Sequence, residues 1–218
     1  MKFRVLTIVL VLSSLTGCGA QSPVPQPLPP PPPAQISPQS MTFDQTAVPK
    51  SGEKIAIIKT NKGVIKLKFF AQFAPETVKN FTELAKKNFY DKLKFHRVIP
   101  NFMIQGGDPL GTGTGGETYK GPGTTLKAEI VSDLKHIRGA VSMARRGDDL
   151  DSATSQFFIV QNKNGYASLN GEYTIFGQVF EGMEVVDAIA GVERDPMDTP
   201  LKPVIMESVT LQILPYID

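Results

Sequence analysis

A proline-rich stretch near the N-terminus divides the sequence into two parts that cannot fold in the same way. Nine of the 18 prolines fall between positions 23 and 38, and five of them are consecutive, at positions 29–33. Such a stretch cannot bury a hydrophobic core, and it favours the extended polyproline II conformation. We therefore predict that residues 18–50 are a semi-rigid spacer and that the folded domain comprises residues 51–218. A proline-rich docking ligand is the alternative interpretation of the stretch.

The residues before the spacer have the pattern of an export signal. A basic start is followed by an apolar run at residues 5–15, which is short for a membrane-spanning helix and typical of a signal-peptide core. The run ends in Leu-Thr-Gly-Cys, which resembles the bacterial lipobox. Residues 1–17 are therefore predicted to be a lipoprotein signal peptide, and Cys18 the lipidation site. The alternative is a secretory signal with an incidental cysteine.

A lipid on Cys18 predicts where the protein is located. Several acyl chains on one residue would hold it stably at a bilayer, where a single chain would not. We expect an exported protein that is lipid-anchored to a bacterial membrane, on the periplasmic side or at the cell surface. The spacer would then hold the folded domain away from that membrane.

The composition argues against several classes of function. Two of the 23 basic residues lie in the predicted leader, which leaves 21 basic residues against 21 acidic ones. This balance provides no electrostatic footprint for nucleic acid. Cys18 is the only cysteine, and His96 and His136 are the only histidines, so a zinc site is not expected. We predict no metal, no cofactor, no nucleic-acid partner and a monomeric chain.

The folded part reads as many strands and two helices. Residues 54–60 and 64–70 alternate in polarity around a turn that contains Gly63, which predicts a hairpin. A helix is predicted to begin at Pro75, and a second one to span residues 183–190 and to end at Gly191. The other strand-like runs are residues 95–99, 102–105, 139–144, 156–161, 173–180 and 204–214. Pattern alone indicates an antiparallel β domain, either a barrel or a sandwich.

Two patterns that suggest chemistry have simpler explanations, and a third pattern is absent. Residues 111–116 fit Gly-x-Gly-x-x-Gly, but Gly-Pro-Gly at residues 121–123 prevents the helix that a dinucleotide site requires. No Gly-x-Ser-x-Gly elbow marks a serine nucleophile. The carboxylates at positions 148, 149 and 151 lie among Arg and Gly residues, as in a solvated loop.

One segment, residues 95–108, concentrates groups that suit a binding surface. Arg97 and Gln105 are an even number of residues apart, so strand geometry can bring both to one surface beside apolar groups. A plain surface cation at Arg97 and a core residue at Phe102 are the alternative.

At this segment the sequence resembles the cyclophilin family, and the resemblance extends over roughly residues 55–213. The further matching motifs are residues 74–78, 80–81, 113–116, 142–144, 155–159 and 169–171. The resemblance implies an all-β-dominated fold, a closed eight-stranded antiparallel barrel capped by two helices, with the active site on its outer surface. It also implies a peptidyl-prolyl cis/trans isomerase acting on Xaa-Pro bonds. Together with the predicted lipid anchor, this activity predicts exported or membrane-proximal proteins as substrates.

The same resemblance implies a role for individual residues. The catalytic residues would be Arg97, Phe102 and Gln105. The substrate-binding residues would be Met103, Gly113, Ala144, Arg145, Gln156, Phe158, Leu169 and Tyr173. The partners would be proline-containing peptides and unfolded or folding client proteins. A non-catalytic proline-peptide binding module or chaperone is the alternative function.

Overall fold

The computed structural model describes residues 43–215. The predicted signal peptide, the lipidation site Cys18 and most of the predicted spacer lie outside the described residues. Within the described range, none of the helices combines the length and the apolar character needed to cross a membrane.

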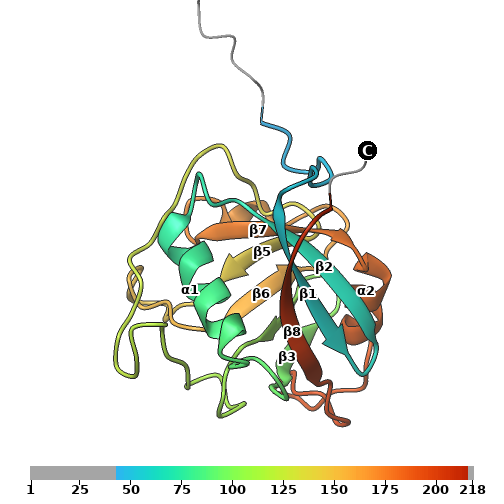
Figure 1. Ribbon diagram of the computed structural model, residues 1–218. Coiled ribbons are helices and arrows are strands. Elements are labelled where there is room, and N and C mark those ends of the chain that lie inside the picture. The colour runs from blue at the N-terminus through green and yellow to red at the C-terminus, as the bar shows by residue number, and fades with distance from the viewer. Residues whose placement is uncertain (1–42, 216–218) are drawn as a thin grey trace, which may run out of the picture. The chain divides into compact units, whose positions relative to one another are not determined.

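Eight antiparallel strands form one curved sheet in the order β3-β4-β6-β5-β7-β2-β1-β8 (Figure 1). The strands are β1 Lys54–Thr60, β2 Gly63–Phe69, β3 Phe95–Ile99, β4 Met103–Gly106, β5 Ala140–Met143, β6 Phe157–Val160, β7 Ile175–Glu181 and β8 Met206–Ile213. The helices are α1 Pro75–Lys86, α2 Met183–Ala190 and the 3-10 turn η1 Ala167–Leu169. Helices α1 and α2 lie on opposite sides of the curved sheet (Figure 1).

The sheet is an open half-barrel, so the prediction of a closed barrel was wrong. Strands β3 and β8 are the two edges, and they are linked only by an isolated bridge between Lys94 and Ile205 and by neighbouring backbone hydrogen bonds. This bridge lies one residue before the start of both strands. Two antiparallel strands that meet at their first residues run away from each other, so they cannot extend the contact into a ladder.

The first hairpin and the first helix form where local sequence favours them. Gly63 has a φ of 135°, a conformation that side chains with a Cβ rarely adopt, and it closes the turn between β1 and β2. Helix α1 begins with Pro75, whose fixed φ and missing N–H suit the first helical position. Phe81 and Leu84 of this helix are fully buried in the core inside the half-barrel.

A second apolar cluster covers part of the sheet outside that core. Its buried members include Phe70, Met103 and Phe158. It extends to Phe43, whose ring packs edge-on against Phe70 at 5.3 Å and Phe73 at 4.8 Å between centroids. Ordered structure therefore begins at least eight residues before the predicted domain start at residue 51.

Candidate functional site

Arg97 and Gln105 are directly opposite each other on the neighbouring strands β3 and β4. The turn between these strands carries Phe102, and Asn101 in the turn has a left-handed φ of 59°. The backbone N–H of Asn101 donates a hydrogen bond of 2.8 Å to the Gln161 side chain. The hairpin thus places a guanidinium, an amide and an aromatic ring at one place on the sheet.

These groups line a pocket of about 130 Å³. Its wall consists of Arg97, Phe102, Met103, Gln105, Ala144, Arg145, Phe158, Leu169 and Tyr173. Nine of the eleven predicted site residues therefore lie around one hollow, although they come from four separate stretches of chain. Six of the nine wall residues are apolar or aromatic, and two of these, Met103 and Phe158, are buried.

The two remaining predicted residues, Gly113 and Gln156, line a larger neighbouring hollow of about 420 Å³. Gln105, Ala144 and Arg145 belong to both hollows. The Gln105 amide donates a hydrogen bond of 2.9 Å to the Gln156 side-chain oxygen. Gln156 in turn donates to the carbonyl of Gly115 at 2.7 Å. This chain of amides fixes Gln105 at the boundary between the two hollows.

Arg145 is held in place as part of the pocket wall. Its guanidinium lies 4.6 Å from the centroid of the Tyr173 ring, a cation–π contact. It also donates to the carbonyl of Glu172 at 2.9 Å and pairs with the Glu172 carboxylate at 3.1 Å. Only 9% of the Arg145 side chain is exposed, whereas 44% of the Arg97 side chain is. Arg97 is therefore the more accessible of the two guanidinium groups.

His136 lies directly behind the pocket wall. Its ring stacks on Phe158 with 6.0 Å between centroids and meets Tyr173 edge-on at 6.3 Å. Asn170 Oδ1 accepts the backbone N–H of His136, so Nδ1, 3.0 Å from the same oxygen, must be a donor. Nε2 lies 3.1 Å from the Ser142 hydroxyl, which donates its own proton to the carbonyl of Thr174 at 2.8 Å. Burial lowers the pKa of His136, which favours the neutral imidazole.

Two side chains at the site were not predicted from the sequence. The ring of Tyr166 packs at a tilt against that of Phe102, with 4.4 Å between ring centroids. Asp198, from the connection between α2 and β8, places its carboxylate 3.8 Å from Nε of Arg97. Neither residue belongs to a motif that the sequence analysis used, and nothing in local periodicity indicates its position.

A sequence model of the family described as cyclophilin type peptidyl-prolyl cis-trans isomerase/CLD matches residues 55–211, more than half of the chain. The chain belongs to this family. The prediction from residues 95–108 and the accompanying motifs is therefore confirmed at the level of the family.

Relatives with similar sequences have names that agree with this family. A putative peptidyl-prolyl cis-trans isomerase of Staphylococcus aureus is 36% identical over 189 residues, which cover 75% of this chain and 94% of the relative. A putative bifunctional phosphatase/peptidyl-prolyl cis-trans isomerase of Streptococcus pyogenes is 40% identical, with 73% of this chain and 38% of the relative covered. For peptidyl-prolyl cis-trans isomerase 9 of Schizosaccharomyces pombe these values are 45%, 69% and 24%. The chain thus spans well under half of the last two relatives.

Solved structures show the same fold. A crystal structure of a cyclophilin-type isomerase from Cryptosporidium parvum has a TM-score of 0.70 and 35% identity, with 75% of this chain and 99% of that chain covered. A second crystal structure of that protein, obtained in the presence of the dipeptide Ala-Pro, has a TM-score of 0.68, 35% identity and coverages of 72% and 98%.

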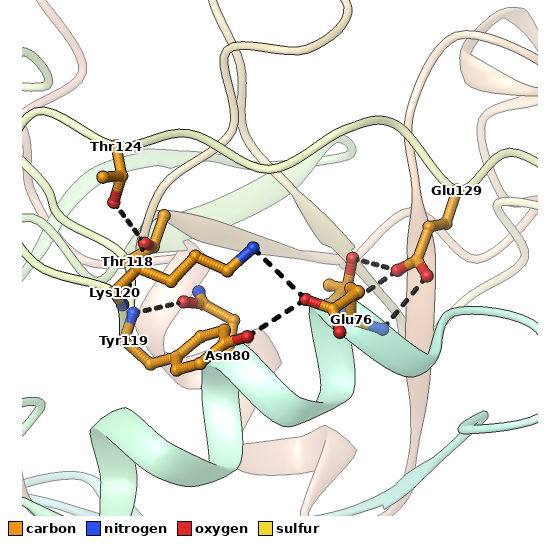
Figure 2. Close-up of polar contacts among 8 residues, drawn as sticks. Glu76, Asn80, Thr118, Tyr119, Lys120, Thr124 and Glu129 are labelled. Carbon is orange, nitrogen blue, oxygen red and sulfur yellow. Dashed lines mark hydrogen bonds and ion pairs between the residues drawn. The ribbon is translucent and has the colours of Figure 1, made fainter.

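In this cyclophilin-family domain, one wall of the larger hollow is held against α1. Residues 123–125 line the hollow, and the hydroxyls of Thr118 and Thr124 are hydrogen-bonded to each other (Figure 2). The backbone N–H of Tyr119 donates to Oδ1 of Asn80 at 2.8 Å, and its hydroxyl donates to Glu76 at 3.2 Å. The loop with the hollow's outer wall is therefore attached to the helix at several points.

Glu129 connects the end of the same loop to the start of α1. The residue before the helix, Ala74, has no side chain that can cap the free N–H groups of the first turn. Instead the Glu129 carboxylate accepts the backbone N–H groups of Glu76 at 3.0 Å and Thr77 at 2.8 Å, together with the Thr77 hydroxyl (Figure 2). A negative charge at this position also favours the helix dipole.

The site offers binding and electrostatic stabilisation rather than bond-making groups. Among residues 43–215, no three His, Cys, Asp or Glu side chains are grouped so that they would hold a metal ion. The pocket combines one accessible guanidinium, one fixed amide and an apolar notch. Such a set can hold a small apolar ring and donate a hydrogen bond to an atom beside it.

Proposed function

We propose that the chain accelerates cis/trans isomerisation of Xaa-Pro bonds in proline-containing peptides and in unfolded or folding proteins. The observation that carries this proposal is the position of Arg97 at the edge of an apolar pocket of about 130 Å³. The crystal structure of a 35% identical relative in the presence of Ala-Pro supports a proline-containing ligand. All pocket residues come from one chain, so a monomer suffices.

The reaction requires no nucleophile. Amide resonance opposes rotation about the Xaa-Pro bond with a barrier of about 18–20 kcal/mol. The uncatalysed exchange takes roughly 10–100 s. To bring the exchange to milliseconds, the barrier must fall by about 5.5 kcal/mol, equivalent to a factor of about 10⁴. No covalent bond is made or broken, so binding and electrostatics must provide this reduction.

Arg97 is the group suited to stabilise the transition state. In the twisted amide, conjugation is lost and the prolyl nitrogen regains a lone pair, which makes it a better acceptor than in the planar ground state. A permanently charged guanidinium donates to that nitrogen more strongly in the twisted form. An interaction that is stronger in the transition state than in the ground state accelerates the reaction.

The other residues of the pocket bind the proline ring and the preceding peptide separately. We propose that Phe102, Met103, Phe158 and Leu169 hold the proline ring, with Tyr173 and Arg145 completing the wall. Gln105 and the backbone at Ala144 would bind the peptide before the proline, and the hollow lined by Gly113 and Gln156 would receive the preceding side chains. One side of the bond is then fixed while the other side turns.

We further propose that the enzyme works on exported or membrane-proximal proteins, held at a bacterial membrane by a lipid on Cys18. The support is the lipobox-like sequence at positions 15–18 and the proline-rich spacer that follows it. Mass spectrometry of the mature N-terminus tests the anchor. We expect a diacylglycerated Cys18, and an unmodified or differently cleaved N-terminus would contradict this part of the proposal.

Exchange NMR on a short Xaa-Pro peptide tests the activity. We expect the wild-type protein to produce exchange on the millisecond timescale and Arg97→Ala to lose about 100-fold of that rate, as when one preorganised donor is removed. Lys59→Ala is the matched control, because Lys59 is an exposed cation on β1 that pairs with Glu207, away from the pocket lining. Unchanged exchange with wild-type protein would refute the enzymatic proposal, and saturable peptide binding without exchange would support a binding module.

A further inference from the structure

The connection between α2 and β8 places a carboxylate beside β3, the strand that carries Arg97. This connection passes beside β3 (Figure 1), where the backbone N–H of Val98 donates to the carbonyl of Asp198 at 2.9 Å. The hydrogen bond fixes Asp198 next to the strand residue that follows Arg97. Oδ2 of Asp198 lies 3.8 Å from Nε of Arg97, and 30% of the Asp198 side chain is exposed.

The surrounding loop holds Asp198 in an unusual backbone conformation. Its φ is 65°, in the left-handed region that residues with a Cβ seldom occupy. Its N–H donates to the carbonyl of Asp195 at 3.0 Å, and the Asp195 carboxylate accepts the N–H groups of Met197 and Thr199 at 2.8 and 2.9 Å. Aspartate adopts this conformation more readily than most residues, and the surrounding hydrogen bonds keep it there.

A second cation balances the charge of the carboxylate. Nε of Arg194 donates to Oδ1 of Asp198 at 3.2 Å, so Asp198 lies between two guanidinium groups. The three charges sum to +1. The arrangement can therefore orient Arg97 without removing the positive charge that faces the proline pocket.

We propose that Asp198 is a positioning residue that orients the guanidinium of Arg97 for the isomerisation, an inference that rests on the function proposed above. At 3.8 Å the carboxylate attracts the Nε edge of the planar guanidinium as an ion pair and leaves its two terminal NH₂ groups for the substrate. A long side chain without such a partner samples many rotamers. Asp198 reduces this freedom, so the donor is already in place when the amide twists.

The test compares the full wild-type chain with its Asp198→Asn variant. The substitution preserves size and the backbone bonds at Val98 and Asp195. It removes the negative charge and replaces one carboxylate oxygen with an NH₂ group. We expect kcat to fall about fivefold with KM within about twofold, because the loss affects the transition state more than peptide binding. We also expect the Arg97 Nε–H signal in a ¹⁵N spectrum to shift and to exchange faster with solvent.

Two further variants separate positioning from loop stability. Asp198→Glu keeps the charge and should recover at least half of the lost kcat. Glu207→Gln removes the carboxylate of the exposed pair with Lys59 and should leave kcat and the Arg97 signal unchanged. Arg194→Gln leaves the Asp198 backbone untouched and frees the Asp198 carboxylate for Arg97. Exchange of the Arg97 Nε–H with solvent should therefore slow. This variant still tests the ion pair between Arg97 and Asp198 if Asp198→Asn fails to fold.

The outcomes distinguish this inference from the proposed function. If Arg97→Ala loses activity while Asp198→Asn retains wild-type kcat, the positioning role is overturned and the isomerase proposal stands. If wild-type protein does not accelerate exchange, the function itself is refuted. An Arg97 Nε–H signal that changes in neither Asp198→Asn nor Arg194→Gln overturns the ion pair in either case.

Discussion

The segment before β1 offers a sharp test of where the folded domain begins. Gln45 is 8% exposed although it lies in a stretch that the sequence assigns to a spacer. Its amide donates to the carbonyl of Lys135 at 2.8 Å and to the Gln178 side chain at 3.2 Å, and its oxygen accepts the N–H of Lys135 at 2.9 Å. Gln45 thus connects the N-terminal segment to β7 and to the loop before β5.

The expected cost of Gln45→Ala follows from these contacts. Each hydrogen bond contributes about 1 kcal/mol net, and the partners left behind are partly shielded from water. Three bonds therefore correspond to a loss of about 2–3 kcal/mol in the free energy of unfolding. For a chain of this size about 1 kcal/mol shifts Tm by about 2–4 °C, so Tm should fall by about 4–12 °C.

Removal of the whole segment should cost less than its contacts suggest. Ordering each residue costs about 1–2 kcal/mol of backbone entropy, and a chain that starts at residue 51 avoids this cost for the missing residues. In Gln45→Ala the segment must still be ordered, so that variant loses the contacts without avoiding the cost. We therefore expect the shortened chain to remain folded and active, with its Tm below that of the wild type.

Thermal unfolding followed by circular dichroism measures the effect. Gln72→Ala is the matched control, because Gln72 is an exposed glutamine next to Phe73. The Tm of this variant should stay within about 1 °C of wild type. Isomerisation at 10 °C should be unchanged in both variants, since Gln45 does not line the pocket. A Tm for Gln45→Ala that equals the control would show that the Gln45 hydrogen bonds do not contribute to the stability of the domain.

Two further predictions concern stability and pH. Burial lowers the pKa of both His96 and His136 from the ordinary value of 6.5, so the unfolded state binds more protons below that pH. The free energy of unfolding should fall as the pH is lowered below about 6.5, by up to about 1.4 kcal/mol per pH unit for each histidine. His136→Gln should reduce this dependence on pH, measured by urea titrations at pH 7.5 and 5.0. An unchanged dependence would contradict a lowered pKa for His136. Glu129→Ala removes the cap of α1 and should lower the free energy of unfolding by about 1 kcal/mol in the same assay, whereas a wild-type value would show that the cap is dispensable.

The sequence predicted well the features that depend on neighbouring residues. The hairpin turn at Gly63, the start of α1 at Pro75 and the end of α2 at Ala190 all follow from local chemistry, and the structure places them there. The pocket was predicted through the cyclophilin-like motifs, and the register that places Arg97 opposite Gln105 shows how an even spacing becomes one surface. The closed barrel was wrong, because closure depends on pairing between β3 and β8 that no local pattern specifies.

The side chains that sequence reasoning missed share one physical property: each makes its contact with a distant part of the chain. Glu129 caps α1 from 53 residues away, and Gln45 reaches Lys135 across 90 residues. In the sequence, a glutamine in a spacer or an aspartate in a turn looks the same whether or not the folded chain provides it with a partner. Asp198 bears most directly on the proposed mechanism, because the same loop that gives it a left-handed backbone also places its carboxylate 3.8 Å from Arg97. A local motif contains the donor that we propose acts on the proline bond, whereas the tertiary fold determines how that donor is held. Only the second depends on residues that no motif contains.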